Sequence, residues 1–251
     1  MKKSMYFNYT KGVALSEKAA AIKNAGFNGT ELFRFFDNRE PLADQYKAAL
    51  EAGLSVEAVH ADFCHTNDVW GESAKGDKWI DFLIECAREQ GALGIPTMVV
   101  HLSRTSVPPE YNSTGLERFR LLCNEAEKCG VKIAFENLRR TDYLEYALSN
   151  IPNAFFCFDC GHEFLYDNGY GILEKYKNRL LCVHLHDNKG EKDSHLLPFD
   201  GTIDWEDMGE RISQTSKSFA LAFEVFCSAD KYKEFPKEVY SRALRVEALI
   251  K

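Results

Sequence analysis

Short apolar runs rich in β-branched and aromatic residues alternate along the chain with longer amphipathic stretches. Such short runs are typical of buried strands, whereas apolar positions three and four residues apart are typical of helices that pack on one face. The pattern predicts strands at residues 5–8, 29–33, 55–60, 97–101, 131–136, 154–159, 180–186 and 220–225. It predicts helices at residues 15–25, 42–52, 78–91, 114–129, 142–149, 205–214 and 231–250.

Alternation of strands and helices predicts parallel pairing through right-handed crossovers. The chain has 251 residues, which is the usual size of an eight-fold β/α barrel, and no Pro/Ser-rich linker divides it. A doubly wound open sheet would usually carry a glycine-rich phosphate turn after its first strand, and none follows residues 5–8. Gly26, Gly53 and Gly130 are the expected stops of three helices. We therefore expect an α/β fold, a single (β/α)8 TIM barrel whose one domain spans residues 1–251.

Composition narrows the class of protein. The formal net charge of −7 opposes broad attraction to nucleic acid or to anionic membranes. No stretch resembles a signal peptide or is long enough to cross a bilayer, so a cytoplasmic location is expected. The eight cysteines are scattered singly, which favours buried thiols over a disulfide framework. Apolar positions on the expected surface helices are compatible with a homodimer.

Histidines and carboxylates fall at the ends of successive expected strands. In a parallel barrel all of these ends meet at one rim, where active sites are built. The residues are His60, His101, Glu136, Asp159, His184 and Glu224, with His162 shortly after Asp159, and Asp193 and His195 in the loop beyond His184. Imidazoles and carboxylates are the groups that bind divalent metal ions, so the sequence predicts a metal site at this rim.

Spacing divides these residues into three sets. Glu136, Asp159, His184 and Glu224 form an oxygen-rich tetrad that suits Mn²⁺, Co²⁺ or Mg²⁺ and tolerates Zn²⁺. His60 and His101 would add a nitrogen-rich site beside it, with Glu136 able to bridge, and the third set is His162, Asp193 and His195. We expect one to three divalent ions, Mn²⁺, Zn²⁺ or Co²⁺, and the number stays open.

Other residues of the same rim are candidates for substrate contacts. His186 shares a strand face with His184, so it could bind substrate or orient a metal ligand. The substrate-binding set that we expect is His162, His186, Lys189 and Trp205. Arg104 and Arg139 are candidates for a phosphate. Asp187 is either a ligand or a loop cap.

Six segments carry a resemblance to a known family: Phe135-Glu136-Asn137, Phe158-Asp159-Cys-Gly-His162, Val183-His184-Leu-His186-Asp187-Asn188, Asp193-Ser-His195, Gly201-Thr-Ile-Asp204-Trp205 and Phe223-Glu224. On them the chain resembles the xylose isomerase-like TIM-barrel superfamily of sugar phosphate isomerases and epimerases, to which endonuclease IV is related. The resemblance implies the metal tetrad for an epimerase, and a three-zinc set of all nine residues for an endonuclease. Ketose 3-epimerases have an arginine shortly after the residue that matches His184, where this chain offers Lys189.

Two reaction classes follow, and both stay open. The first is isomerisation or epimerisation of a sugar, sugar phosphate or related polyol ketone, in which Glu136 and Glu224 transfer protons around a metal-stabilised enediolate. The alternative is metal-dependent hydrolysis of a phosphodiester, as in an endonuclease of the apurinic/apyrimidinic type. The acidic balance and short connections oppose duplex DNA, and so favour a small carbohydrate as the partner. A third interpretation is a metal-dependent sugar binder without catalysis.

Overall fold

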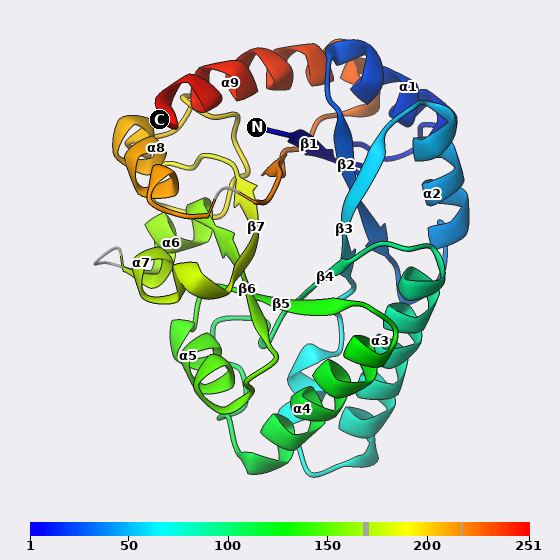
Figure 1. Ribbon diagram of the computed structural model, residues 1–251, viewed down its shortest axis with the longest axis vertical. Helices are drawn as coiled ribbons and strands as arrows, with labels where there is room; N and C mark the ends of the chain where they lie inside the picture. Colours follow the sequence, from blue (N-terminus) through cyan, green and yellow to red (C-terminus); the bar gives the residue numbers. More distant parts are fainter. Residues whose placement is uncertain (168–170, 217) are drawn as a thin grey trace.

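The computed structural model describes residues 1–167, 171–216 and 218–251 (Figure 1). In these residues parallel strands pair in chain order and close into a barrel, because the last strand pairs with the first. The strands are β1 (Lys3–Tyr6), β2 (Gly29–Arg34), β3 (Ser55–Ala61), β4 (Thr97–Val100), β5 (Lys132–Glu136), β6 (Phe155–Asp159), β7 (Leu180–Leu185) and β8 (Leu221–Phe223). The expected (β/α)8 barrel is confirmed.

Helices surround the barrel on its outer side (Figure 1). They are α1 (Leu15–Ala25), α2 (Leu42–Glu51), α3 (Ala74–Ala92), α4 (Ser113–Lys128), α5 (Thr141–Asn150), α6 (Cys160–Tyr166), α7 (Ile172–Tyr176), α8 (Trp205–Ser213) and α9 (Phe235–Leu249). Short 3-10 turns add η1 (Thr66–Trp70), η2 (Lys177–Arg179) and η3 (Ala229–Lys231). Within the described part of the chain, no helix combines the length and the apolar character that a membrane crossing needs.

The expected elements and the observed ones differ mainly at their ends. The first strand lies two residues earlier than expected, because Lys3 pairs with Leu221 and Ser4 with Gly29. Helices α6 and α7 were not expected, since each is too short to show a helical period. The three expected glycine stops are confirmed: Gly26, Gly53 and Gly130 have φ values of 114°, 78° and 75°, in the left-handed region that favours glycine.

Small side chains line the interior of the barrel directly below its C-terminal rim. Val99, Ala134, Cys157 and Cys182 form a buried cluster apart from the main core. Because side chains alternate between the two faces of a strand, the residue two positions further on points inward as well. Each of these four precedes a candidate ligand by two residues, as do Ala58 and Ala222; the ligands are His101, Glu136, Asp159, His184, His60 and Glu224. The candidate ligands therefore form an inward layer on top of a layer of small residues.

The region between η1 and α4 supports the loop after β4. Trp70 is buried and donates from Nε1 to the carbonyl of Leu102, 2.6 Å away. Asn112 caps α4 by accepting from the amide of Gly115, and its own amide donates to the carbonyl of Trp70. A Cβ on Gly115 would lie 2.1 Å from Cε3 of Trp70, so only glycine lets α4 approach the indole ring.

We expect Gly115→Ala to lower the free energy of unfolding by about 1–3 kcal/mol, because the added methyl group overpacks a rigid ring. Chemical denaturation monitored by circular dichroism measures this change. Gly71→Ala is the matched control, since a Cβ there would meet only the carbonyl oxygen of Asp68 at an ordinary contact distance of 3.5 Å. Equal stability of the two variants would contradict the expected role of Gly115.

Candidate metal centre

All nine expected ligands lie at the C-terminal rim of the barrel, on strand ends or on the segments that follow them, and together with His186 they form three groups. Within each group the possible ligand atoms lie within 4.8 Å of one another. The groups are Glu136, Asp159, His184 and Glu224; His60, His101 and Glu136; and His162, His186, Asp193 and His195. Glu136 belongs to two of them.

The first group gathers three carboxylates around one nitrogen of His184. Nδ1 of His184 lies 3.3 Å from Oε2 of Glu224, 3.4 Å from Oε1 of Glu136 and 3.9 Å from Oδ2 of Asp159. This nitrogen is buried and has no hydrogen-bond partner among the residues that the structure describes. A buried imidazole nitrogen that faces three carboxylates without a hydrogen bond fits a divalent cation between them. The residues present therefore fit the metal that the donor set implies.

The second group shares Glu136 with the first. Nε2 of His60 and Nε2 of His101 lie 3.2 Å and 2.8 Å from Oε2 of Glu136, while Oε1 faces His184. The two oxygens of one carboxylate thus point into two neighbouring groups. A carboxylate in this position can bridge two cations.

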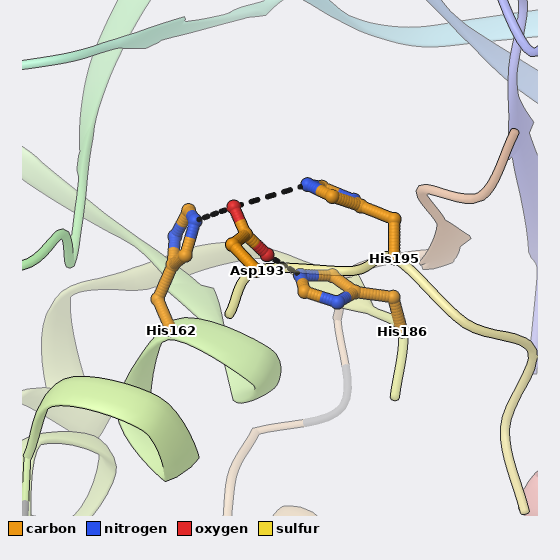
Figure 2. A group of neighbouring side chains, drawn as sticks. All are labelled: His162, His186, Asp193 and His195. Carbon is orange, nitrogen blue, oxygen red and sulfur yellow. Dashed lines mark hydrogen bonds and ion pairs between the residues drawn. The ribbon is translucent and has the colours of Figure 1, made fainter. Parts of the chain in front are cut away.

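The third group joins α6 to the loop after β7, as Figure 2 shows. Oδ2 of Asp193 lies 3.1 Å from Nε2 of His162 and 3.3 Å from Nε2 of His195. His186 belongs to this group too, with Nε2 lying 3.9 Å from Oδ1 of Asp193 and 3.0 Å from Oδ1 of Asp159. The structure therefore places His186 between the first and third groups.

The ring of His186 is held against the backbone of α6. A Cβ on Gly161 would lie 2.0 Å from Cε1 of this ring, so a side chain there would displace the imidazole. Asn188 donates to the carbonyl of Gly161 and fixes the loop to the same turn. The glycine between Cys160 and His162 is thus required by the close approach of His186.

Backbone carbonyls orient three of the imidazoles. Nδ1 of His60, His162 and His195 lies 2.8 Å, 3.0 Å and 2.8 Å from the carbonyls of Ala61, Asn137 and Glu224. A carbonyl only accepts, so each Nδ1 carries the hydrogen and Nε2 is left facing its group. Hydrogen bonds of this kind fix the ring and the tautomer of a metal ligand.

Glu31, in β2, is a buried partner of the first group that the sequence analysis missed. Its two carboxylate oxygens lie 3.1 Å and 3.2 Å from Nε2 of His184. Nε2–H of His184 donates to Glu31, and this leaves Nδ1 as the ligand atom. A glutamate inside an apolar run was the available signal, because a buried charge needs a partner.

The pKa shifts in the cluster show that its buried carboxylates are stabilised by positive charge. Burial opposes charge on Glu136, yet His101 and His184 hold the pKa of its carboxyl well below the usual range. Burial also lowers the pKa of His60, but its hydrogen bond with Glu136 and the negative charges of Glu136, Glu224 and Glu31 together outweigh burial and raise the pKa to about 9. Burial likewise lowers the pKa of His195, but its hydrogen bond with Asp193 and the negative charges of Glu224, Asp193 and Asp159 together outweigh burial and raise the pKa to about 9. Protons on these histidines thus occupy the place that metal ions would take.

Asp187 organises the loop that carries Asp193 and His195. Its buried carboxylate accepts from the amides of Asn188, Phe199 and Ile203 and from Nε1 of Trp205, at 2.9, 3.0, 3.2 and 2.8 Å. Asp187 therefore acts as a loop cap, the second of the two roles considered for it. Trp205 is buried under this loop, and Lys189 is exposed on it.

A pocket of about 240 Å³ opens over the three groups. Beside ligands of all three groups it is lined by Phe63, Ser103, Arg104, Thr105, Leu138, Arg139 and Tyr166. Of the residues expected to contact substrate, His162 lines this pocket, whereas His186 lies beneath it and Trp205 and Lys189 do not line it. Both candidate phosphate-binding arginines do. A pocket of this size fits a small molecule.

Solved structures with the same fold include several sugar epimerases. A D-tagatose 3-epimerase-like protein is 21% identical, with a TM-score of 0.76 and coverage of 98% of each chain. An L-ribulose 3-epimerase is 14% identical, with a TM-score of 0.79 and coverage of 100% of this chain and 95% of that one. The 3-keto-D-glucoside 4-epimerase of E. coli is 15% identical, with a TM-score of 0.75 and coverage of 99% and 100%. At these identities the likeness shows the fold.

Curated relatives are uncharacterized proteins. One from Sinorhizobium fredii is 36% identical over 180 residues, which are 63% of this chain and 57% of that protein. One from Methanocaldococcus jannaschii is 26% identical over 221 residues, which are 78% of this chain and 72% of that protein. The match thus spans little more than half the length of the first relative. Residues 19–246 match the model of the family described as xylose isomerase-like TIM barrel. The chain belongs to the xylose isomerase-like TIM-barrel family.

Proposed function

We propose that this protein is a divalent-metal-dependent enzyme that isomerises or epimerises a sugar, a sugar phosphate or a related polyol ketone. The observation that carries the proposal is the convergence of three carboxylates on Nδ1 of His184, which has no hydrogen-bond partner in the described part of the chain. The fold neighbours named as sugar epimerases support the same reaction class.

The tetrad of Glu136, Asp159, His184 and Glu224 would hold the ion next to the substrate. A divalent cation there polarises a carbonyl oxygen and stabilises the negative charge that develops when the adjacent C–H proton leaves. Asp159 is fixed for this task, because its backbone amide donates to Oδ1 of Asn137 and its own Oδ1 accepts from the amide of His162. The ligand is thereby rigid before an ion arrives.

Glu136 and Glu224 are the residues that we assign to proton transfer. They come from β5 and from the end of β8, on different sides of the barrel, and both line the pocket. One carboxylate can remove a proton from a bound sugar while the other returns one to the opposite face. His162, which lines the pocket, would contribute a hydrogen bond to the same substrate, whereas the buried His186 would orient the ligands around it.

Arg104 and Arg139 define where a phosphate or another anionic group of the substrate would bind. Both line the pocket, and Nη2 of Arg139 donates to the hydroxyl of Tyr166 at 2.9 Å. Guanidinium groups bind phosphate oxygens well because they offer several parallel donors. The pocket volume of about 240 Å³ favours one sugar ring over a polymer.

The contacts of both carboxylate oxygens of Glu136 favour a second candidate function, hydrolysis of a phosphoester. One of its oxygens faces His60 and His101 and the other faces His184, so ions in both groups leave this carboxylate no oxygen for proton transfer. Closely spaced divalent ions can clamp the attacking and the leaving oxygen of a phosphoester. A small phosphorylated substrate would suit the pocket in this case as well.

Removing the charge of Glu31 should weaken metal binding. We expect Glu31→Gln to reduce the affinity for Mn²⁺ about 10- to 100-fold, because the residue orients His184 without being a ligand. Isothermal titration calorimetry on chelator-stripped protein measures this affinity. Glu57→Gln is the matched control, since Glu57 pairs with Lys2 at the other end of the barrel. An equal loss of Mn²⁺ affinity in both variants, or no Mn²⁺ binding by the unchanged protein, would contradict the proposed centre.

Proton transfer by the two glutamates predicts a second result. Glu136→Gln and Glu224→Gln should each slow the exchange of solvent deuterium into a sugar or sugar phosphate substrate by at least about 100-fold. Nuclear magnetic resonance follows the exchange in D₂O, with substrates found by screening ketoses and their phosphates. Retention of exchange by both variants would remove the two-carboxylate mechanism.

Metal stoichiometry separates the two reactions. For the isomerase we expect one tightly held ion, in the tetrad, and exchange activity that persists when His101→Ala disables the second group. For the hydrolase we expect up to three ions, and loss of phosphatase activity by at least about 100-fold in the same variant. Elemental analysis and assays on small phosphoesters supply both measurements. His65→Ala, an exposed histidine outside all three groups, is the control.

A further inference from the structure

A second cavity, of about 510 Å³, lies at the opposite end of the barrel. Lys2 and Lys132, near the starts of β1 and β5, are exposed at its mouth, and it extends inward to Glu31. The cavity exists because the inward residues at this level are small: Ser4, Ala58, Cys182 and Ala222 all line it. Other barrels fill this level with bulky branched side chains.

Polar groups buried along this cavity indicate that it holds solvent. Ser4 is fully buried, and its hydroxyl has no hydrogen-bond partner among the described residues. Glu31 is only 3% exposed, and it lines the cavity while it accepts from His184. Buried polar atoms without protein partners are usually satisfied by water where space allows.

Cys182 is the cysteine that borders this cavity. It precedes His184 by two residues on β7, so both side chains point into the barrel. Its neighbour on the adjacent strand β6 is Cys157, which is in register with it. Cys182 thus lies between the solvent of the cavity and the metal tetrad.

We propose that Cys182 is a modification site for small sulfur electrophiles, which reach it through the N-terminal cavity rather than through the substrate pocket. With methyl methanethiosulfonate, the thiol sulfur attacks the methylthio sulfur and forms a mixed disulfide. The bond between the methylthio and sulfonyl sulfurs breaks, and methanesulfinate leaves with the thiol proton taken by solvent. The sulfonyl group is reduced to sulfinate as the thiol is oxidised to a disulfide.

The attached group would enter the space next to Glu31 and below His184. Both residues are almost completely buried, and Glu31 lines the cavity, so a methylthio group on Cys182 would compete for the space that the carboxylate of Glu31 borders. Modification at Cys182 is therefore expected to disturb the hydrogen bond that orients His184. The cavity would connect the redox chemistry of small thiol compounds to the metal centre from the side opposite the substrate.

Labelling of the folded, full-length protein tests the route. A hydrogen bond with Cys157, together with burial, raises the pKa of the Cys182 thiol, so the reaction is slow and rates are compared at one pH by peptide mass spectrometry. Cys182 should react faster than Cys123 and Cys160, which are also buried but do not line the cavity. Ser4→Leu, which fills the cavity, should slow labelling of Cys182 by at least about tenfold, whereas Ser4→Ala should not.

Thr97→Ile is a second variant that fills the cavity, because Thr97 also lines it. It replaces Ser4→Leu if that variant does not fold. Labelling of Cys182 no faster than of Cys123 would overturn the inference. If neither Ser4→Leu nor Thr97→Ile slows the labelling of Cys182 in folded protein, the proposed route is overturned.

The effect on the metal centre rests on the proposed function and is measured separately. Protein modified at Cys182 should bind Mn²⁺ at least about tenfold more weakly than unmodified protein, since the partner of His184 is displaced. Cys182→Ala protein, treated with the same reagent, corrects for modification of the partly exposed Cys64, Cys129 and Cys227. Unchanged affinity in the modified protein would overturn the coupling. Failure of unmodified protein to bind Mn²⁺ would count against the proposed function, whereas the labelling result decides the inference by itself.

Discussion

The carboxylate of Glu136 lies among four imidazoles, and the arrangement of the site depends on this contact. His60 and His101 approach one oxygen, and His162 and His184 approach the other at 3.2 Å and 3.4 Å. A buried carboxylate without positive neighbours would cost several kcal/mol. The chain surrounds it with groups that become cationic with protons or that share metal ions with it. Proton and metal are therefore alternative ways to neutralise the same charge.

The shape of the barrel makes this concentration of ligands possible. Each ligand that projects inward from a strand stands above a small residue, as Glu136 does above Ala134 and His184 above Cys182. Large side chains at the lower level would push the ligand layer outward and separate the groups. The small residues at the lower level also leave the lower barrel partly empty. The layer of candidate ligands and the N-terminal cavity therefore both depend on these small side chains.

The sequence predicts the fold, and which histidines and carboxylates gather at the rim, because both depend on short-range patterns. Alternating apolar runs locate the strands, and parallel closure brings their ends together, so residues as far apart as His60 and Glu224 line one pocket. Contacts within the barrel are harder to predict. Glu31 sits inside an apolar strand, and only the register between β2 and the other strands shows that it reaches His184. His186 was expected either to bind substrate or to orient a metal ligand, and the close approach of Gly161 places it between two groups.

Trp205 shows a different limit of sequence reasoning. An aromatic residue after a polar loop at the rim suggests a wall for a sugar ring, and the sequence offers no sign that Asp187 will take its indole N–H. That hydrogen bond turns Trp205 into an anchor for the loop that carries Asp193 and His195. The third group therefore depends on a buried loop cap, while the tetrad depends on strands. The strand-borne tetrad is the more rigid of the two, because backbone pairing between β5, β6, β7 and β8 fixes its ligands directly. A site that must hold an ion firmly near substrate is best built on such paired strands, whereas a loop-borne group can gain or lose its ion as the loop moves.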